Sequence, residues 1–396
     1  MRSLAACTLL AAAVAAQQQT FEVSLRDGRV FGASAVTGDP RQGFDVVVGG
    51  SRRHLAPEEL LLIVRAPAQV VALPSISFPD GDVVRGVIVG GDAAGNRVEL
   101  LSPVLGRLEF PVDRIGAIAA AGVKDPLRLR LPDGVAEAIF LRATVGYDVL
   151  AGSLHRCGDR GVLFAPDGAT EPAWYATDAF VALRIGDPTA RRAPAVASLS
   201  TRAGDRLGVA LRALSAETVQ CELDSGAVVE LRAADLACLS FAGAGTFLSD
   251  LQPVEVSESG YDAEVLYPWR RDLSVLGDPL VVGGRTHGKG LGVHSRSRLV
   301  FRVPDGCAQF WTRVGLDDSS PALGVAAVAE VRVLVDGAVK FEQRALGAGA
   351  AKDSGLVPVQ PGQLVALEVD FGPGRDIGDR VDWLSPVFLP AAGRRP

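Results

Sequence analysis

The chain has 396 residues, 48% of them hydrophobic, and a formal net charge of −6 at pH 7. Its Lys and Arg residues are scattered rather than gathered into a stripe, so it lacks the electrostatic footprint of a nucleic-acid-binding protein. We therefore expect no nucleic acid among its partners. This length suffices for two or three domains.

Residues 1–19 have the pattern of a secretory signal peptide. Met1-Arg2 supplies a positive start, an apolar run follows from Leu4 to Ala16, and its small final residues precede Gln17. The run is too short to span a bilayer, and no later stretch offers about 18 apolar residues without a charge. We therefore expect a secreted or periplasmic protein with no membrane span.

The next part of the chain repeats one arrangement of strands and turns four times. Each copy opens with an alternating apolar strand, a turn and a second strand that meets a glycine, as in residues 21–32. It closes on a short apolar strand, as in residues 60–64, and the third copy opens through residues 143–147. A repeat of roughly 45 to 60 residues with Asp-Gly turns favours small antiparallel barrels.

We predict two copies in residues 20–125 and two in residues 126–243. The joints between copies contain proline, at Pro67, Pro126, Pro188 and Pro194. In their turns and alternation the copies resemble the Sm-like or SH3-like five-strand barrels. Such barrels usually present an edge or groove to a partner, so the resemblance implies protein partners for this half. His54 and His155 stand alone on predicted loops or strand faces and suggest no chemistry.

Four cysteines follow the leader, and their spacings match no zinc pattern. They are Cys157, Cys221, Cys238 and Cys307. Cys221 and Cys238 lie within one predicted barrel. Two alternatives stay open for them, a disulfide bond or buried thiols that act as small hydrophobic side chains.

Residues 247–390 differ from the repeats in composition and in the spacing of their predicted strands. They hold three of the four tryptophans, and short strand signals follow one another with no helical run between them. Asp336-Gly337 turns one strand into Val339-Lys340-Phe341, which is a hairpin signal. The predicted fold class is therefore all-β, with repeated small β-barrels followed by a β-sandwich.

The motifs of this segment occur in the order of a known family. They are Leu248-Ser249-Asp250-Leu251, Gly277-Asp278-Pro279-Leu280, Lys289-Gly290-Leu291-Gly292-Val293-His294-Ser295, Val314-Gly315-Leu316-Asp317-Asp318, Val333-Leu334-Val335-Asp336-Gly337 and Asp379-Arg380-Val381-Asp382-Trp383. On these residues the segment resembles the NPCBM family of carbohydrate-binding modules. The resemblance implies a galactose-binding-like jelly roll with a glycan or polysaccharide as its ligand.

Six residues are candidates for contact with a sugar: Trp269, His294, Asp317, Asp318, Asp382 and Trp383. His294 follows an apolar strand, where it either hydrogen-bonds a sugar hydroxyl or satisfies a buried backbone group. Asp317 and Asp318 end a predicted strand, where carboxylates accept hydroxyl hydrogen bonds, bind calcium or cap a turn.

Asp382 and Trp383 have the same two interpretations. Trp383 offers a flat apolar face to a sugar ring or packs into the core, since its neighbours are apolar. Trp269 has fewer apolar neighbours in the loop 267–271, which favours it as the exposed stacking platform.

The sequence contains neither a Gly-x-Ser-x-Gly nor a His-Glu-x-x-His motif. Residues 283–289 have the spacing of a phosphate loop, but Gly290 replaces the required Ser or Thr. We expect a secreted, non-catalytic carbohydrate-binding protein without a cofactor, and calcium is left open. The alternative is a structural or assembly protein whose sandwich and barrels bind protein partners. A glycosidase needs two carboxylates that face each other across a cleft, which small barrels rarely offer.

Overall fold

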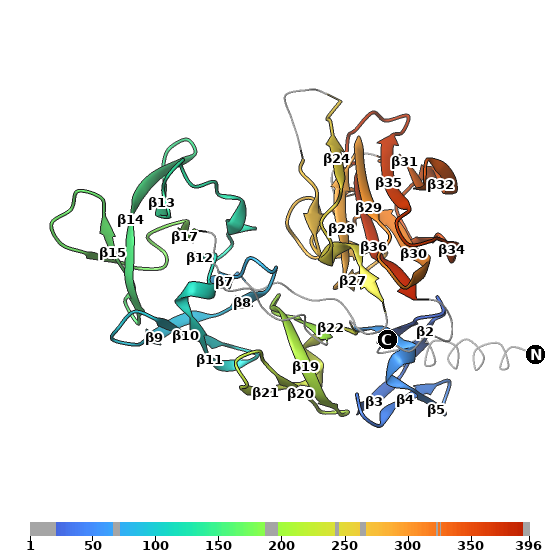
Figure 1. Ribbon diagram of the computed structural model, residues 1–396, viewed down its shortest axis with the longest axis horizontal. Helices are drawn as coiled ribbons and strands as arrows, with labels where there is room; N and C mark the ends of the chain where they lie inside the picture. The colour runs from blue at the N-terminus through green and yellow to red at the C-terminus, as the bar shows by residue number, and fades with distance from the viewer. Residues whose placement is uncertain are drawn as a thin grey trace, which may run out of the picture. The chain divides into compact units, whose positions relative to one another are not determined.

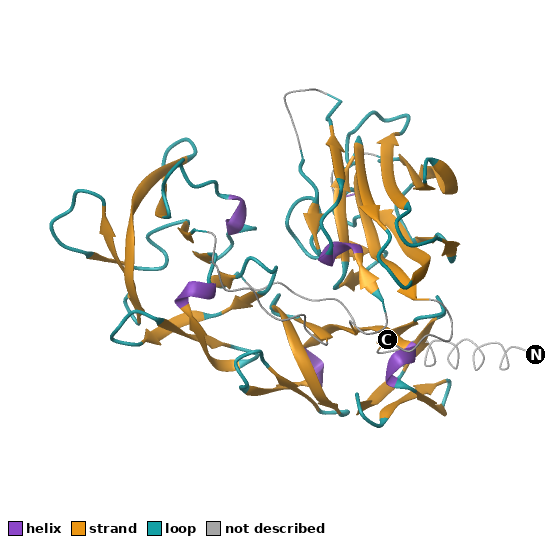
Figure 2. Ribbon diagram, viewed as in Figure 1, coloured by secondary structure: helices purple, strands orange, loops and turns teal. Residues whose placement is uncertain are grey.

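The computed structural model describes residues 21–65, 72–186, 197–241, 245–261, 267–321, 324 and 326–390. These residues form strands and single turns of 3-10 helix (Figure 2), which confirms the predicted all-β class. Within these ranges no helix has the length and apolar character needed to cross a membrane. The predicted signal peptide and the joints at Pro67, Pro188 and Pro194 lie outside the described residues.

The chain divides into two compact units. The first unit comprises Met1–Pro67, Ala213–Ala216 and Ala237–Pro396, and the second comprises Ala68–Arg212 and Glu217–Leu236. The first predicted copy therefore shares a unit with the sandwich. The second copy, the third and most of the fourth form the other unit.

The four copies follow one another along the chain (Figure 1). In the first, the second and the fourth, a turn of 3-10 helix precedes the closing strand. The first contains β1 (Phe21–Leu25), β2 (Val30–Ala33), β3 (Ala35–Asp39), β4 (Gly43–Val48), β5 (Ser51–Leu55), η1 (Pro57–Glu59) and β6 (Leu60–Arg65). The second contains β7 (Ser75–Ser77), β8 (Val83–Arg85), β9 (Val87–Gly91), β10 (Arg97–Ser102), β11 (Gly106–Pro111), η2 (Val112–Arg114) and β12 (Ala117–Ala119).

The third copy follows η3 (Pro126–Arg128) and contains β13 (Glu137–Arg142), β14 (Tyr147–Gly158), β15 (Gly161–Pro166), β16 (Ala173–Tyr175) and β17 (Ala182–Ile185). Its opening strand therefore lies before residue 143, and the segment predicted to open it contains the turn. The fourth contains β18 (Ala197–Thr201), β19 (Arg206–Leu214), β20 (Thr218–Glu222), β21 (Val228–Arg232), η4 (Ala233–Asp235) and β22 (Leu236–Phe241).

The opening and closing strands of a copy pair with each other. The antiparallel ladders are β1–β6, β7–β12 and β13–β17 in the first three copies. Closing strands also pair between copies, β6 with β22 and β12 with β17. In the described part of the chain these strands form open sheets rather than the predicted closed barrels, and the division into four copies stays a prediction.

The C-terminal strands form the two sheets of a sandwich (Figure 1). One sheet has the order β25 (Arg270–Arg271), β28 (Gly290–His294), β36 (Arg380–Pro390), β30 (Cys307–Leu316) and β33 (Lys352–Asp353), with β23 (Thr246–Phe247) beside β36 and β34 (Val357–Pro358) beside β30. The other has the order β24 (Glu255–Glu258), β29 (Ser297–Arg302), β35 (Leu364–Phe371), β31 (Ala329–Val335) and β32 (Ala338–Leu346). A separate hairpin joins β26 (Leu280–Val282) and β27 (Arg285–His287).

Alternation along the strands builds the core between these sheets. In β31 every second residue is buried, because successive side chains of a strand point to opposite faces. A second apolar cluster joins the sandwich to β6 and β22, and its members are Leu61, Leu62, Val64, Cys238, Phe247, Trp311, Val387 and Leu389. The first copy therefore shares buried apolar surface with the sandwich.

The four cysteines that the structure describes are buried, free thiols. Of the two alternatives for Cys221 and Cys238, this geometry favours small hydrophobic side chains. Burial raises the pKa of Cys157, Cys221 and Cys238 to about 12.

Candidate functional site

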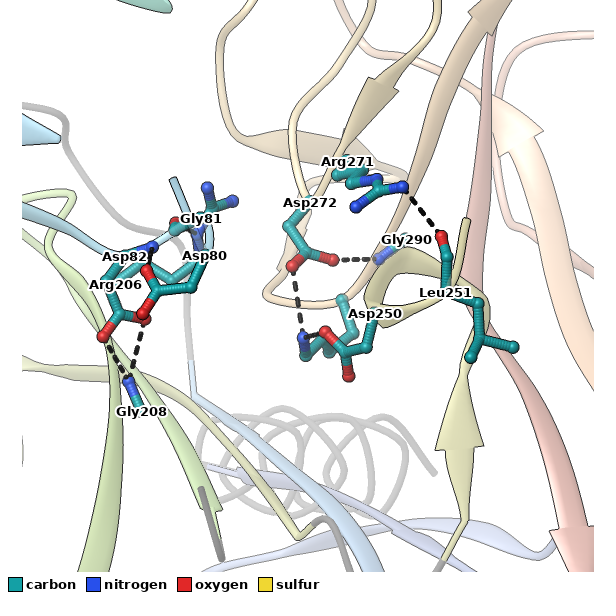
Figure 3. A network of polar contacts seen from close by, with 11 residues as sticks. Asp80, Gly81, Asp82, Arg206, Gly208, Asp250, Leu251, Arg271, Asp272 and Gly290 are labelled. Carbon is teal, nitrogen blue, oxygen red and sulfur yellow. Dashed lines mark hydrogen bonds and ion pairs between the residues drawn. The ribbon is translucent and has the colours of Figure 1, made fainter. Parts of the chain in front are cut away.

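Strand β28 begins beside a buried ion pair. Lys289 is 5% exposed, and its Nζ lies 2.6 Å from Oδ1 of Asp250 and 3.2 Å from Oδ2 of Asp272. Asp272 also accepts the Gly290 N–H at 3.0 Å, a contact drawn in Figure 3. A buried ammonium group needs such partners, so these carboxylates fix the start of the strand.

The two glycines of β28 leave no room for side chains. A Cβ on Gly290 would lie 2.4 Å from the carbonyl oxygen of Trp383, and one on Gly292 would lie 2.3 Å from that of Leu273. Glycine therefore allows β28 to lie close to β36 and to the loop after β25. This packing fixes the position at which the strand ends, at His294.

His294 faces an exposed aromatic side chain at the end of β28. The ring of Tyr267 stacks on the imidazole with a centroid distance of 4.5 Å and an interplanar angle of 24°. Tyr267 is 41% exposed, whereas His294 is 8% exposed. Tyr267 therefore presents aromatic surface to solvent directly beside a mostly buried histidine.

The hydrogen bond of His294 fixes its tautomer. Nδ1 lies 2.9 Å from the backbone carbonyl oxygen of Ser295, which accepts, so Nδ1 carries the proton and donates it. Burial lowers the pKa of His294, which favours the neutral ring. A neutral ring that is protonated at Nδ1 leaves Nε2 as a hydrogen-bond acceptor.

A shallow pocket surrounds this histidine. Its lining comes from the end of β24, the loop before β25 and the turn between β28 and β29, and consists of Glu258, Ser259, Gly260, Tyr267, His294, Ser295 and Arg296. It combines one aromatic side chain with a carboxylate, two hydroxyl groups, an imidazole and a guanidinium group. The pocket itself is small, so a ligand would lie over it and meet these polar groups at its mouth.

A buried carboxyl group supports the pocket from behind. The Ser295 hydroxyl donates a hydrogen bond to Oδ2 of Asp379 at 2.9 Å, and Asp379 is 1% exposed. Burial raises the pKa of Asp379 to about 6, and the neighbouring carboxylate of Asp376 acts in the same direction.

A second aromatic group lies next to the pocket. Tyr261 is 53% exposed, and its ring meets that of Phe371 edge-on at 5.6 Å. The guanidinium group of Arg296 lies 5.0 Å from the centre of the Phe371 ring, and that of Arg375 lies 5.0 Å from the Tyr261 ring. Arg296 therefore contacts both the pocket and this aromatic pair.

Of the six predicted site residues, His294 lines this pocket, and Trp269 contacts its lining at Glu258. Trp269 is half-buried and packs against the core of the sandwich, with the guanidinium group of Arg271 5.3 Å from its ring centre. The backbone N–H of Trp269 donates to the Glu258 carboxylate at 2.6 Å. The exposed platform of this loop is Tyr267 rather than Trp269.

Asp317 and Asp318 lie at the end of β30 and bind the hairpin β26–β27. Asp318 accepts the N–H groups of Gly283 and Gly284 at 2.9 and 2.7 Å. Asp317 is 3% exposed and accepts the Ser319 N–H at 2.9 Å. These contacts cap turns, which is one of the three interpretations that the sequence left open, and their role in sugar contact stays a prediction.

Asp382 and Trp383 are fully buried in β36. Burial raises the pKa of Asp382 well above its usual range, and the Asp317 carboxylate adds to the effect. Trp383 belongs to the core of the sandwich. Its ring therefore presents no face on which a sugar can stack in this structure.

Tyr267, Glu258 and Arg296 are the aromatic and charged pocket residues that the sequence did not single out. The sequence did offer a signal for Tyr267, because this aromatic residue lies in the same loop, 267–271, as Trp269. Glu258 and Arg296 belong to no motif, and only the fold brings them together. Within the described ranges, no three His, Cys, Asp or Glu side chains are grouped so that they could hold a metal ion.

Residues 245–389 match the model of the NPCBM/NEW2 domain family, which confirms the predicted resemblance for the C-terminal segment. A curated protein of Renibacterium salmoninarum that carries the name of an endo-alpha-N-acetylgalactosaminidase is 29% identical over 157 residues. The match covers 38% of this chain and 10% of that protein, so the chain spans about a tenth of the relative's length.

Two solved structures from Clostridium perfringens are also similar. One is CBM51 of GH95 in complex with methyl-galactose, with 22% identity over 37% of this chain and 99% of that chain and a TM-score of 0.33. The other holds CBM51-2 in complex with GlcNAc and the INT domains of ZmpB, with 24% identity over 48% of this chain and 42% of that chain and a TM-score of 0.34.

Proposed function

We propose that the NPCBM/NEW2 domain at residues 245–389 binds a glycan in the pocket around His294. The observation that carries this proposal is the stacked pair of Tyr267 and His294 at the edge of a polar pocket. Pyranose rings have one apolar face and a rim of hydroxyl groups, so they fit an exposed aromatic ring beside hydrogen-bonding side chains.

Each pocket residue has a role in this proposal. The exposed surface of Tyr267 packs against the apolar face of the sugar, and Nε2 of His294 accepts a hydroxyl hydrogen bond. Glu258 accepts from a second hydroxyl and is held by the Trp269 N–H. Arg296 donates to a ring or hydroxyl oxygen. Trp269 acts on the pocket through its backbone N–H, which holds the Glu258 carboxylate.

We assign binding rather than hydrolysis to this pocket. A glycosidase places two carboxyl groups on either side of the scissile bond. Asp379 is 1% exposed and lies behind Ser295, so it does not face a ligand together with Glu258. The protein would then act as a secreted or periplasmic glycan-binding protein, with protein partners held by the repeats.

A glycan array probed with the full chain tests this function. We expect binding to a defined glycan from a panel that includes galactosides and N-acetylhexosaminides. Tyr267→Ala and His294→Ala should each lower the affinity at least about tenfold, which corresponds to about 1.4 kcal/mol. Val339→Ala is the matched control, because Val339 is 51% exposed on β32 of the same domain and outside the pocket.

Two results would contradict the proposal. A folded wild-type chain that binds nothing on the panel removes the function and favours the structural alternative. Binding that Tyr267→Ala and His294→Ala leave unchanged removes the assigned site. The full chain is used because the sandwich shares buried apolar surface with β6 and β22.

A further inference from the structure

The second and fourth copies are joined by two equivalent hydrogen bonds, in each of which an Asp carboxylate of one copy accepts a backbone N–H of the other. The Asp82 carboxylate accepts the N–H of Gly208 at 3.0 and 3.1 Å (Figure 3). The Asp205 carboxylate accepts the N–H of Arg85 at 2.7 Å. Arg85 lies three residues after Asp82, and Gly208 lies three residues after Asp205. The two hairpins therefore meet about a local two-fold axis.

The strand edges follow the same symmetry. Strands β8 and β19 pair antiparallel at Val83 and Arg206, which are the residues directly after Asp82 and Asp205. A contact in which the same surface is used on both sides is isologous. In each hairpin the Asp is followed by the strand residue that pairs across the axis. The residue three positions after the Asp donates its N–H to the Asp of the other hairpin.

The third copy has Asp148, Val149 and Ala151 at the same spacing, with Tyr147 where the other two hairpins have Gly81 and Gly204. Val149 pairs with Phe140 on β13, and the Phe140 carbonyl accepts the N–H of Val181. Since that carbonyl points away from β14, Phe140 and Val149 form a pair without mutual hydrogen bonds. The N–H and C=O of Val149 therefore also point away from β13, as do those of Ala151 two residues later.

This outer edge is apolar and lacks a strand partner in the described part of the chain. Over residues 147–150, β14 pairs with β13 alone, whereas the Ala151 carbonyl accepts the N–H of Asp167 at 2.9 Å and the ladder with β15 starts at Gly152. The exposed apolar side chains are Val145 at 90%, Tyr147 at 51% and Val149 at 42%. Proteins normally protect an exposed strand edge of this kind, because it invites pairing with another strand.

We propose that this edge pairs with the same edge of a second copy of the chain. The two-fold axis would pass between the two Val149 residues, and Tyr147 would pack against Ala151 of the partner. Each Asp148 carboxylate would accept the Ala151 N–H of the other chain, as Asp82 does with Gly208. Arg142 and Asp148 are the charged residues of segment 142–150, so their formal charges cancel and the two edges do not repel.

Sedimentation of the full chain across a concentration series tests the pairing. We expect a monomer–dimer equilibrium that Val149→Lys weakens at least tenfold, since it places two ammonium groups opposite each other. Val145→Lys should weaken it too, and its 90% exposure makes an effect on folding negligible. Val228→Lys is the control, at 56% exposure on β21 of the same unit.

A cross-link tests the symmetry directly. Val149→Cys should form a disulfide-linked dimer on mild oxidation, because the axis places residue 149 opposite itself, and Val228→Cys should not. A wild-type chain that stays monomeric at all concentrations overturns the proposal. A dimer that persists in both Val149→Lys and Val145→Lys overturns it as well. Neither readout involves a glycan, so the result is independent of the proposed function.

Discussion

Glu22 and Arg313 lie 291 residues apart in the chain and form an ion pair with an N–O distance of 2.7 Å. Their side chains are 9% and 12% exposed, and Arg285 binds the other carboxylate oxygen of Glu22. Burial alone would raise the pKa of Glu22, but Arg313 and the neighbouring cations lower it below its usual value. The carboxylate is therefore charged, and it ties the first copy to the sandwich.

Glu22→Ala should destabilise the first unit by about 3 kcal/mol. The substitution leaves the Arg313 guanidinium group in a buried position without its partner, which is the costly way to break a buried ion pair. Arg285→Ala is the matched control and should cost less than about 1 kcal/mol, since exposed ion pairs contribute little. Denaturant unfolding of both variants measures the difference, and equal losses would contradict the assignment.

Lys289→Met should also destabilise the first unit by about 3 kcal/mol. The variant keeps an unbranched side chain of similar length but removes the ammonium group that is paired with the buried Asp272 carboxylate. Lys352→Met, at an exposed position on β33, is the control and should leave the unfolding midpoint unchanged. A midpoint for Lys289→Met as high as that of the wild type would show that the Lys289 ion pair is dispensable.

Asp379→Asn should change how stability depends on pH. The folded state raises the pKa of Asp379 from 3.8 to about 6, so its protonated form is favoured in the native protein. This contribution is fully present below about pH 4 and is lost as the pH rises through about 6. The variant should therefore gain stability relative to wild type between pH 4.5 and pH 7.5. Melting temperatures at both pH values measure this gain, and Asp305→Asn, at an exposed position, is the control.

Cys157, Cys221 and Cys238 should resist iodoacetamide at pH 8 in the native protein. With a pKa of about 12, fewer than about one thiol in a thousand is ionised at that pH, and burial blocks the reagent. Unfolding in guanidinium should expose all three to modification. Peptide mapping by mass spectrometry resolves each site, and a native adduct or a disulfide between Cys221 and Cys238 would refute the expectation.

Local patterns made much of the fold predictable. The alternation in β31 and the Asp336-Gly337 turn follow from neighbouring residues, so the sequence indicates them directly. The pairing of β6 with β22 does not, because it joins strands far apart in the chain. Glu22 illustrates the same limit, since a charged residue in an alternating strand suggests solvent exposure until Arg313 is placed beside it.

The candidate site was only partly predictable for a related reason. His294 belongs to one family motif, but another motif of the same family contains Asp382 and Trp383, which are fully buried. A motif alone does not distinguish a residue that packs in the core from one that contacts a ligand. Tyr267 and Arg296 meet at the pocket because β24, β28 and β29 end near each other, which only the sandwich topology reveals.

The division of the chain into units has a consequence for its synthesis. The second unit is an insertion within the first, between residues 67 and 237 apart from the short segment Ala213–Ala216. During translation β6 therefore emerges long before β22 and the sandwich strands that cover Leu61, Leu62 and Val64. The apolar surface of the first copy therefore stays uncovered while the inserted copies are synthesised. It is buried only when β36, the last strand of the sandwich, has been made.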